Sequence, residues 1–213
     1  MANIKRHLNK NLLKEKVARV AADSFIRKGI KTVKMDDIAS ELGISKRTLY
    51  ELFGDKEELL LEVVKYHREE MKKYMMQIAE KADNVLEIIM NFYIKTTEDF
   101  QITNVLFFED IKKYPQVTKF LEDGRKENIA STIAFYRKGV DQGIFRADVN
   151  YDIVQEMIHV QMDTLIHSDA CRNYSLVEIF KTVVFMHLRG ISTVKGLELV
   201  DEFLDRMNEI HKN

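Results

Sequence analysis

Residues 35–56 read MDDIASELGISKRTLYELFGDK, and their small, glycine and apolar positions have the spacing of a helix-turn-helix motif. Gly43 suits the tight turn, because glycine adopts positive φ angles that a side chain resists. Ala39 is small where two helices must cross closely, and Leu49 and Leu52 share one face of a second helix. The positions expected to hold the two helices together are Ile38, Ala39, Leu42, Ile44, Leu49 and Leu52.

The outward face of the second helix is polar and basic. In a DNA-binding motif of this type, the N-terminal residues of the second helix meet base edges in the major groove. The outward positions are Ser45, Lys46, Arg47, Thr48 and Glu51. A short amphipathic helical hairpin with a glycine corner also occurs in proteins that do not bind DNA. The flanking sequence is therefore needed to decide between the two.

Both flanks favour a DNA-binding unit. Upstream, apolar residues repeat at helical spacing before Gly29, which is placed to cap the end of a first helix. Downstream, Asp55 is placed as the N-cap of a further helix, with Glu58 three residues later as its capping-box partner. The upstream apolar residues are Val17, Val20, Ala21, Phe25 and Ile26.

With these flanks the N-terminal sequence resembles the TetR family of transcriptional regulators. The resemblance rests on Phe25, Gly29, Val33, Ile38, Ala39, Gly43, Ser45, Thr48, Leu49, Tyr50, Phe53, Lys56, Glu57 and Leu59. Weaker similarity follows in residues 139–148 and 189–196. The resemblance implies an all-α fold, with an N-terminal three-helix DNA-binding domain over residues 1–56 and a C-terminal helical ligand-binding and dimerisation domain over residues 57–213.

The resemblance also implies a function and a set of DNA contacts. The expected function is a repressor that binds double-stranded DNA at a palindromic operator as a homodimer and is released by a small, largely apolar ligand. The predicted DNA-binding residues are Thr32, Lys34, Ser45, Lys46, Arg47, Thr48, Tyr50 and Lys56. Of these, Lys46 and Arg47 are expected to read the groove, and Tyr50 and Lys56 to hold phosphates. Lys34 replaces the usual Ser or Thr N-cap, so Thr32 or the Lys34 ammonium is expected to take over that phosphate contact.

Composition agrees with a helical regulator. The chain has 213 residues, 46% of them apolar, with eight glycines and one proline, which leaves little room for an all-β protein. Its one cysteine, Cys171, excludes an intrachain disulfide. No stretch approaches the ~18 uncharged apolar residues of a membrane span, and the N-terminus lacks the apolar core of a signal peptide. We therefore expect a cytoplasmic protein without a membrane partner.

The net charge of −1 hides a strong asymmetry. Residues 1–56 carry 13 Lys plus Arg against 7 Asp plus Glu, a balance of +6, and residues 57–213 carry 20 against 27, a balance of −7. A basic head on an acidic body suits a DNA-binding unit joined to a second domain, because neutralising phosphates supplies most of the nonspecific affinity for DNA.

The remaining sequence predicts successive helices at about 56–82, 84–99, 102–113, 115–142, 151–169, 174–190 and 197–211. The fifth and sixth of these are apolar on more of their surface than one buried face needs, so we expect them to form the dimer interface. An ordinary monomeric core between them is the alternative. The predicted interface residues are Val154, Met157, Ile158, Leu165, Val183, Val184 and Ile191.

Aromatic and methionine side chains concentrate between the head and these helices. The family resemblance implies an effector cavity there, although such residues at helical spacing also fit a plain core. The predicted effector-binding residues are Tyr74, Met75, Phe92, Tyr93, Phe107, Phe108 and Tyr136.

A metal-dependent helical enzyme is the alternative to a DNA-binding protein. His159, Asp163 and His167 follow at four-residue intervals and could supply metal ligands to a helical hydrolase. A polar stripe beside an apolar one is more simply a solvated face. No glycine-rich phosphate loop, nucleophile elbow or zinc-protease motif supports catalysis, so we expect no enzyme activity, no metal and no cofactor. A DNA-binding dimer that is regulated by a protein partner, or that has no effector, is a further alternative.

Overall fold

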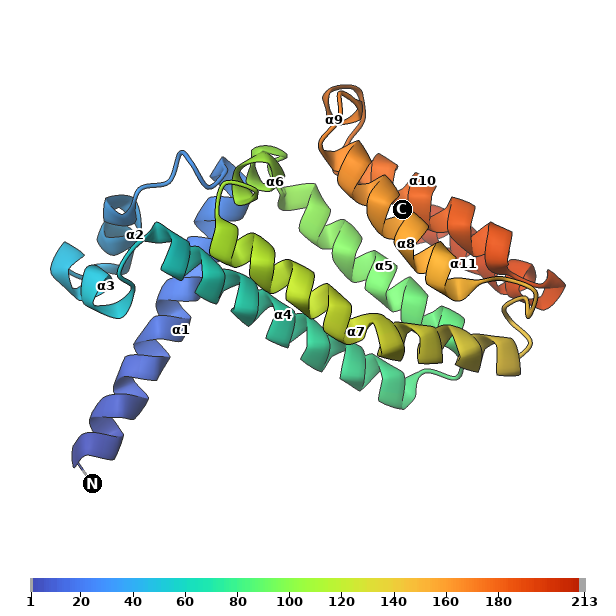
Figure 1. The fold of residues 1–213 in the computed structure, drawn as a ribbon, viewed down its shortest axis with the longest axis horizontal. Coiled ribbons are helices and arrows are strands. Elements are labelled where there is room, and N and C mark those ends of the chain that lie inside the picture. Colours follow the sequence, from blue (N-terminus) through green and yellow to red (C-terminus); the bar gives the residue numbers. More distant parts are fainter. Residues whose placement is uncertain (1, 211–213) are drawn as a thin grey trace. The chain divides into compact units, whose positions relative to one another are not determined.

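The chain forms an all-α protein in the computed structural model, which describes residues 2–210 and the side chains of residues 10–207 (Figure 1). The helices of this described part are α1 (Ala2–Lys28), α2 (Met35–Leu42), α3 (Lys46–Leu52), α4 (Lys56–Lys81), α5 (Val85–Ile102), α6 (Leu106–Ile111), α7 (Pro115–Asp141), α8 (Tyr151–Ile166), α9 (Ala170–Asn173), α10 (Leu176–Ile191) and α11 (Val194–Ile210). The all-α prediction is confirmed. Within the described residues, Phe145 and Ser192 form an isolated β-bridge and no strand is present.

Most predicted helices lie within a few residues of the observed ones. The helix expected at 102–113 is shorter, and the four-residue helix α9 was not predicted. No helix of the described part is long and apolar enough to cross a lipid bilayer.

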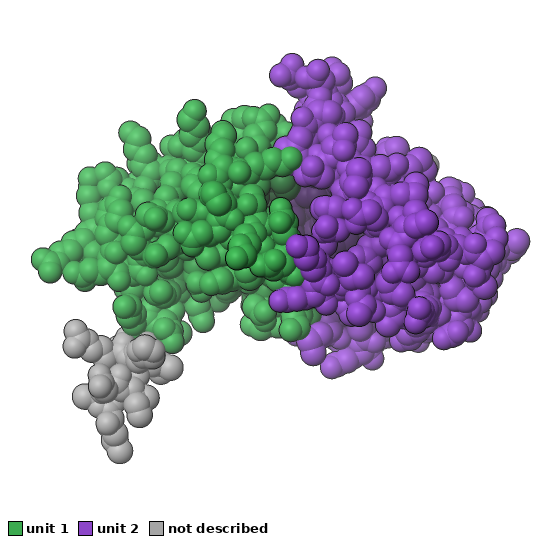
Figure 2. All heavy atoms as spheres, viewed as in Figure 1, with its two compact units in different colours: residues 1–73, 102–124 green, residues 74–101, 125–213 purple. Residues whose placement is uncertain are grey.

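The chain divides into two compact units (Figure 2). Unit 1 comprises residues 1–73 and 102–124, and unit 2 comprises residues 74–101 and 125–213. Unit 1 therefore contains α6 and the first turns of α7 in addition to the helix-turn-helix. Both α4 and α7 begin in unit 1 and end in unit 2.

The core of unit 1 is built from the apolar faces of its helices around the fully buried Phe25, Ile38, Leu49 and Leu59. Gly29 ends α1 with a φ of 81°, in the left-handed region that favours glycine. At the start of α4, Asp55 accepts a hydrogen bond from the backbone N–H of Glu58 at 2.8 Å, as predicted. The Glu58 carboxylate accepts in return from the backbone N–H of Gly54, one residue before the expected partner.

The core of unit 2 is rich in aromatic rings. Tyr93 of α5 packs against Phe180 and Phe185 of α10 and Phe203 of α11, with ring centroids 5.0–6.1 Å apart. Aromatic pairs at such distances contribute about 0.5–1.5 kcal/mol each beyond the apolar area that they bury. Near the end of α7, Gly139 leaves room for the Phe145 ring, because a Cβ on Gly139 would lie 2.2 Å from that ring.

Candidate DNA-binding surface

The helix-turn-helix forms as the sequence indicates. Helices α2 and α3 are joined through Gly43, whose φ is 65° and whose backbone N–H bonds to the carbonyl of Ser40 at 3.1 Å. Ser45 caps α3: its hydroxyl oxygen accepts from the backbone N–H of Thr48 at 3.0 Å. Ile38 and Leu49 are fully buried between the helices. The two short helices therefore leave the opposite face of α3 to solvent.

The predicted groove-reading cations lie on this exposed face. The Arg47 side chain is 88% exposed, and its Nε lies 2.8 Å from Oε1 of Glu51, one turn later in α3. Lys46 is ion-paired with Asp36 of α2. These acidic partners raise the pKa of Lys46 and of Arg47. The hydrogen bond is the larger cause, and the attraction between opposite charges is the smaller one. Exposed pairs of this kind are weak, so DNA phosphates and bases can replace the carboxylates at small cost.

The hydroxyl of the predicted phosphate ligand Thr32 already serves the fold. It lies 2.6 Å from the carbonyl of Lys28 and 2.9 Å from that of Gly29, and so closes the end of α1. A phosphate contact through this hydroxyl would have to break these bonds. Lys34 is exposed and gives α2 no side-chain cap. Its backbone N–H instead donates to the Asp37 carboxylate at 2.9 Å, which leaves the Lys34 ammonium available.

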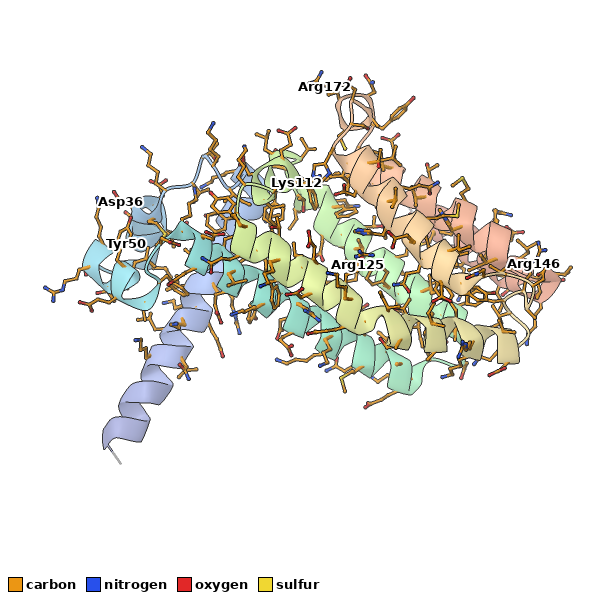
Figure 3. The ribbon with its side chains drawn as sticks, viewed as in Figure 1. Asp36, Tyr50, Lys112, Arg125, Arg146 and Arg172 are labelled. Carbon is orange, nitrogen blue, oxygen red and sulfur yellow. The ribbon has the colours of Figure 1, made fainter. Side chains whose placement is uncertain are left out.

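The other two predicted phosphate ligands differ in exposure. Tyr50 is 48% exposed on α3 (Figure 3). Lys56 is half-buried, with its ammonium 3.5 Å from the carbonyl of Lys31 and 5.8 Å from the Phe25 ring centroid. Burial lowers the pKa of Lys56, against the opposing effect of Asp110 and Asp37. Lys56 therefore helps to hold the start of α4 against the α1–α2 connection, in addition to its predicted contact.

A buried carboxylate that the sequence analysis did not single out supports this surface. Asp110 of α6 is 6% exposed and accepts from the backbone N–H of Lys31 at 2.7 Å and from the Lys113 ammonium at 2.8 Å. Asn104, just before α6, donates its backbone N–H to the carbonyl of Ile26 at 2.8 Å. Helix α6 is thus bonded to the end of α1 and to the connection that carries Thr32 and Lys34.

The predicted effector-binding residues fall in different units. Phe107 and Phe108 lie on α6 in unit 1, with ring centroids 5.5 Å apart. In unit 2, Tyr93 is buried in the aromatic core, and the Tyr136 ring stacks on Tyr151 at 4.9 Å. Burial raises the pKa of both Tyr93 and Tyr136. The others, also in unit 2, are the half-buried Tyr74 and Met75 and the exposed Phe92.

Unit 2 has a cleft of about 420 Å³ between α5 and α11. None of the predicted effector-binding residues lines it. Its lining residues are Asp83, Asn84, Leu86, Glu87, Met90, Asn91, Ile94, Leu199, Phe203, Arg206 and Met207. The predicted effector site stays a prediction.

The predicted dimer residues divide between the interior and the surface of unit 2. Met157 is 47% exposed, Ile158, Leu165 and Val184 are half-buried, and Val154, Val183 and Ile191 are buried within the chain itself. The exposed apolar residues of α8 and α10 are Ile153, Met157, Val160 and Met186. The spacing of Ile153, Met157 and Val160 places them on one face of α8.

The polar stripe of α8 also lies in unit 2. His159 is exposed, and Nδ1 of His167 lies 2.6 Å from the backbone carbonyl of Asp163. Within the described part of the chain, no group of three or more His, Cys, Asp or Glu side chains is arranged to hold a metal ion.

Comparison with known proteins agrees with this geometry. Residues 18–63 match the family described as bacterial regulatory proteins, tetR family. The HTH-type transcriptional repressor KstR2 of Mycolicibacterium smegmatis is 25% identical over 150 residues, which cover 68% of this chain and 73% of the repressor. The ketosteroid transcriptional regulator KstR2 of Mycobacterium tuberculosis is similar in fold, with a TM-score of 0.57, 21% identity, and coverage of 84% of this chain and 95% of that one.

A putative transcriptional regulator from Saccharomonospora viridis, solved in complex with choline, shares the fold with a TM-score of 0.69 and 18% identity, over 86% of this chain and 99% of that one. These likenesses cover both the helix-turn-helix and the helical C-terminal part. The proteins concerned are regulators rather than enzymes. Residues 18–63 are a DNA-binding domain of the TetR family, and the chain as a whole is similar to TetR-family helix-turn-helix transcriptional regulators.

Proposed function

We propose that the chain is a homodimeric repressor that binds a palindromic operator through α3 and is released by a small, largely apolar ligand. The exposed basic face of α3 carries this proposal, because Lys46 and Arg47 stand where side chains of a recognition helix reach base edges. The KstR2 relative is a repressor, which supports repression over activation. Selecting bound DNA from random duplexes tests the proposal. An inverted repeat is expected, with half-sites about 34–36 Å apart or a multiple of that distance. Recovery of no preferred sequence would contradict it.

The exposed apolar face of α8 and α10 supports dimerisation. Ile153, Met157 and Val160 are exposed on one face of α8, and exposed apolar side chains that share a face are typical of an interface. Met157→Glu is therefore expected to give monomers with little operator affinity, because an unpaired charge would be buried in the interface. His159→Glu places the same charge on the exposed polar side of α8 and is the matched control. Sedimentation measures the oligomeric state of both variants. A dimeric Met157→Glu protein would exclude this face of α8 as the dimer interface.

Polar atoms in the interior of unit 2 support a ligand with a few hydrogen-bonding groups on an apolar body. The hydroxyl of Thr96, Oε1 of Gln155 and Nε2 of His187 are buried without a hydrogen-bond partner within the described residues. Buried polar atoms normally have partners, and ligand sites combine apolar walls with a few such atoms. The description of KstR2 as a ketosteroid regulator and the choline bound to the Saccharomonospora viridis regulator suggest two compound classes to test, steroids and choline-like compounds.

The switch would use the helices that belong to both units. A ligand that weakens operator binding tenfold must bind the DNA-free form about tenfold better, which is about 1.4 kcal/mol of coupling. Steroid-like and choline-like compounds should be screened by thermal shift and then by operator release. If compounds stabilise the protein but leave operator affinity unchanged, the ligand switch is wrong. Control by a protein partner, or DNA binding without an effector, would then be the better proposal.

A further inference from the structure

The positive charge of unit 1 is concentrated before the helix-turn-helix. Residues 18–63, the part that matches the TetR family, carry eight Lys plus Arg and nine Asp plus Glu. Residues 1–17 carry five Lys plus Arg and a single acidic residue, Glu15. The segment that folds as the helix-turn-helix is thus close to neutral, and the first half of α1 supplies the excess. Nonspecific attraction to DNA depends on such cations.

One face of α1 changes from apolar to basic along its length. The residues that bury α1 in the core of unit 1 are Val17, Ala18, Ala21 and Phe25. Continuing towards the N-terminus at the same helical spacing, this face carries Lys14 and then Lys10. A face that packs on the protein at one end therefore presents ammonium groups at the other end.

Lys14 connects this basic face to the recognition helix. Its ammonium lies 5.2 Å from the ring centroid of Phe53, the residue that follows the last residue of α3. The basic part of α1 thus begins beside the C-terminal end of α3. Lys10 lies one turn further on, and Figure 1 shows α1 continuing beyond α2 and α3 towards its N-terminus.

The cations of this segment are free of carboxylate partners within the described residues. Lys10 and Lys16 are exposed, and no described carboxylate pairs with Lys10, Lys14, Lys16 or Arg19. In contrast, Lys46 and Arg47 of α3 are both ion-paired, with Asp36 and Glu51 respectively. A phosphate group would therefore find the ammonium groups of α1 already available.

We propose that the basic face of α1, formed by Lys10 and Lys14, binds the phosphate backbone of duplex DNA beside the half-site that α3 reads. Residues 2–16 precede the buried part of α1 and span about 22 Å of helix, at about 1.5 Å per residue. That length corresponds to about six base pairs at about 3.4 Å each. The contact is independent of sequence, so it raises affinity without adding base preference. It rests on DNA binding by α3 and is separate from the proposed effector.

Two double variants of the full-length protein test the assignment. Lys10→Gln/Lys14→Gln removes one exposed lysine and the cation over Phe53 from the basic face. Lys16→Gln/Arg19→Gln is the matched control, because it removes one exposed lysine and the cation over the Tyr66 ring from the rest of α1. Operator affinity is measured against salt concentration, on duplexes that end at the half-sites and on duplexes extended by about ten base pairs on each side.

The first double variant is expected to lower the salt slope by about 3.6, because the dimer loses four phosphate contacts, two in each protomer, at about 0.9 each. Between about 50 and 200 mM salt, operator affinity should therefore fall by a factor that is about 150 times larger for the wild type than for this variant. The wild type should bind the extended duplex more tightly than the short one, and the first variant should lose that difference while the control keeps it. Lys10→Gln alone, which removes no ring contact, should give about half the slope change.

Three results would overturn the proposal. The first is an equal decrease of the salt slope in both double variants, which would indicate that only the total charge of α1 matters. The second is wild-type affinity that does not depend on flanking DNA. The third is loss of base preference in Lys10→Gln/Lys14→Gln, which would place these lysines in sequence readout. Arg47→Ala separates the proposal from the function of α3, since it should relax base preference and leave the flank dependence intact.

Discussion

Replacing Asp110 should loosen the attachment of α6 to the DNA-binding part of unit 1. The carboxylate is 6% exposed, and its two oxygens accept from the backbone N–H of Lys31 and from the Lys113 ammonium. Asp110→Ala leaves the Lys31 N–H without its acceptor and removes the bond that joins α6 to the α1–α2 connection. Asp110→Asn keeps the shape and one acceptor oxygen, so it should retain part of the bond.

The expected loss follows from the surroundings of each partner. A hydrogen bond to a charged group contributes about 1.5–3 kcal/mol to stability. The Lys113 side chain is 61% exposed, so that ion pair adds at most about 1 kcal/mol. Asp110→Ala should therefore reduce the free energy of unfolding by about 2–3 kcal/mol, or about 4–12 °C in Tm for a chain of this size. Asp110→Asn should lose about half as much.

Thermal and urea unfolding measure these losses, with Glu109→Ala as the control from the same helix. Glu109 is exposed, and its removal should change Tm by little. Operator affinity should also fall in Asp110→Ala, because the α1–α2 connection carries Lys34. Wild-type stability in Asp110→Ala would refute the role of this carboxylate. Equal losses in Asp110→Ala and Glu109→Ala would indicate a general weakness of α6 instead.

The same carboxylate predicts a pH dependence. Burial by itself raises the pKa of Asp110, but the hydrogen bonds from Lys113 and from the Lys31 N–H outweigh burial, so the pKa lies below its usual value. A lowered folded-state pKa contributes stability that is present above the unfolded value of about 3.9 and is lost as the pH falls through the folded value. Wild type and Asp110→Asn should therefore converge in stability under acid.

Arg47→Ala should cost about 1–3 kcal/mol of operator binding and relax base preference at one position of each half-site; an equal loss on random DNA in a titration would contradict direct readout. Gly139→Ala should destabilise unit 2 by about 1–3 kcal/mol, because the new Cβ would lie 2.2 Å from the Phe145 ring, and unchanged urea unfolding would refute this close packing. Gly43→Ala should reduce the free energy of unfolding by about 1–2 kcal/mol through its positive φ alone, since no atom beyond the adjacent residues lies within 4 Å of the new Cβ. Gly43→Asn should cost less, and equal melting of the two Gly43 variants would show that φ is not the cause.

Much of the helix-turn-helix could be predicted from the sequence because its determinants are local. Apolar residues at helical spacing place Ile38 and Leu49 in the core, and Gly43 takes the turn whose φ a side chain would resist. Ser45 caps α3 through a hydrogen bond to Thr48, which is only three residues away in the sequence. These choices depend on neighbours in the chain, and the family resemblance extends them to the all-α fold and to the class of regulator.

Contacts between distant residues were decided only by the tertiary structure. Asp110 and Lys31 are 79 residues apart, and nothing in the pattern of α6 indicates that its carboxylate holds the α1–α2 connection. Helical periodicity marked Val154 and Met157 alike as interface residues, yet Val154 is buried within the chain and Met157 is exposed. Periodicity shows that a face is apolar, whereas the packing of neighbouring helices determines how much of that face remains for a partner.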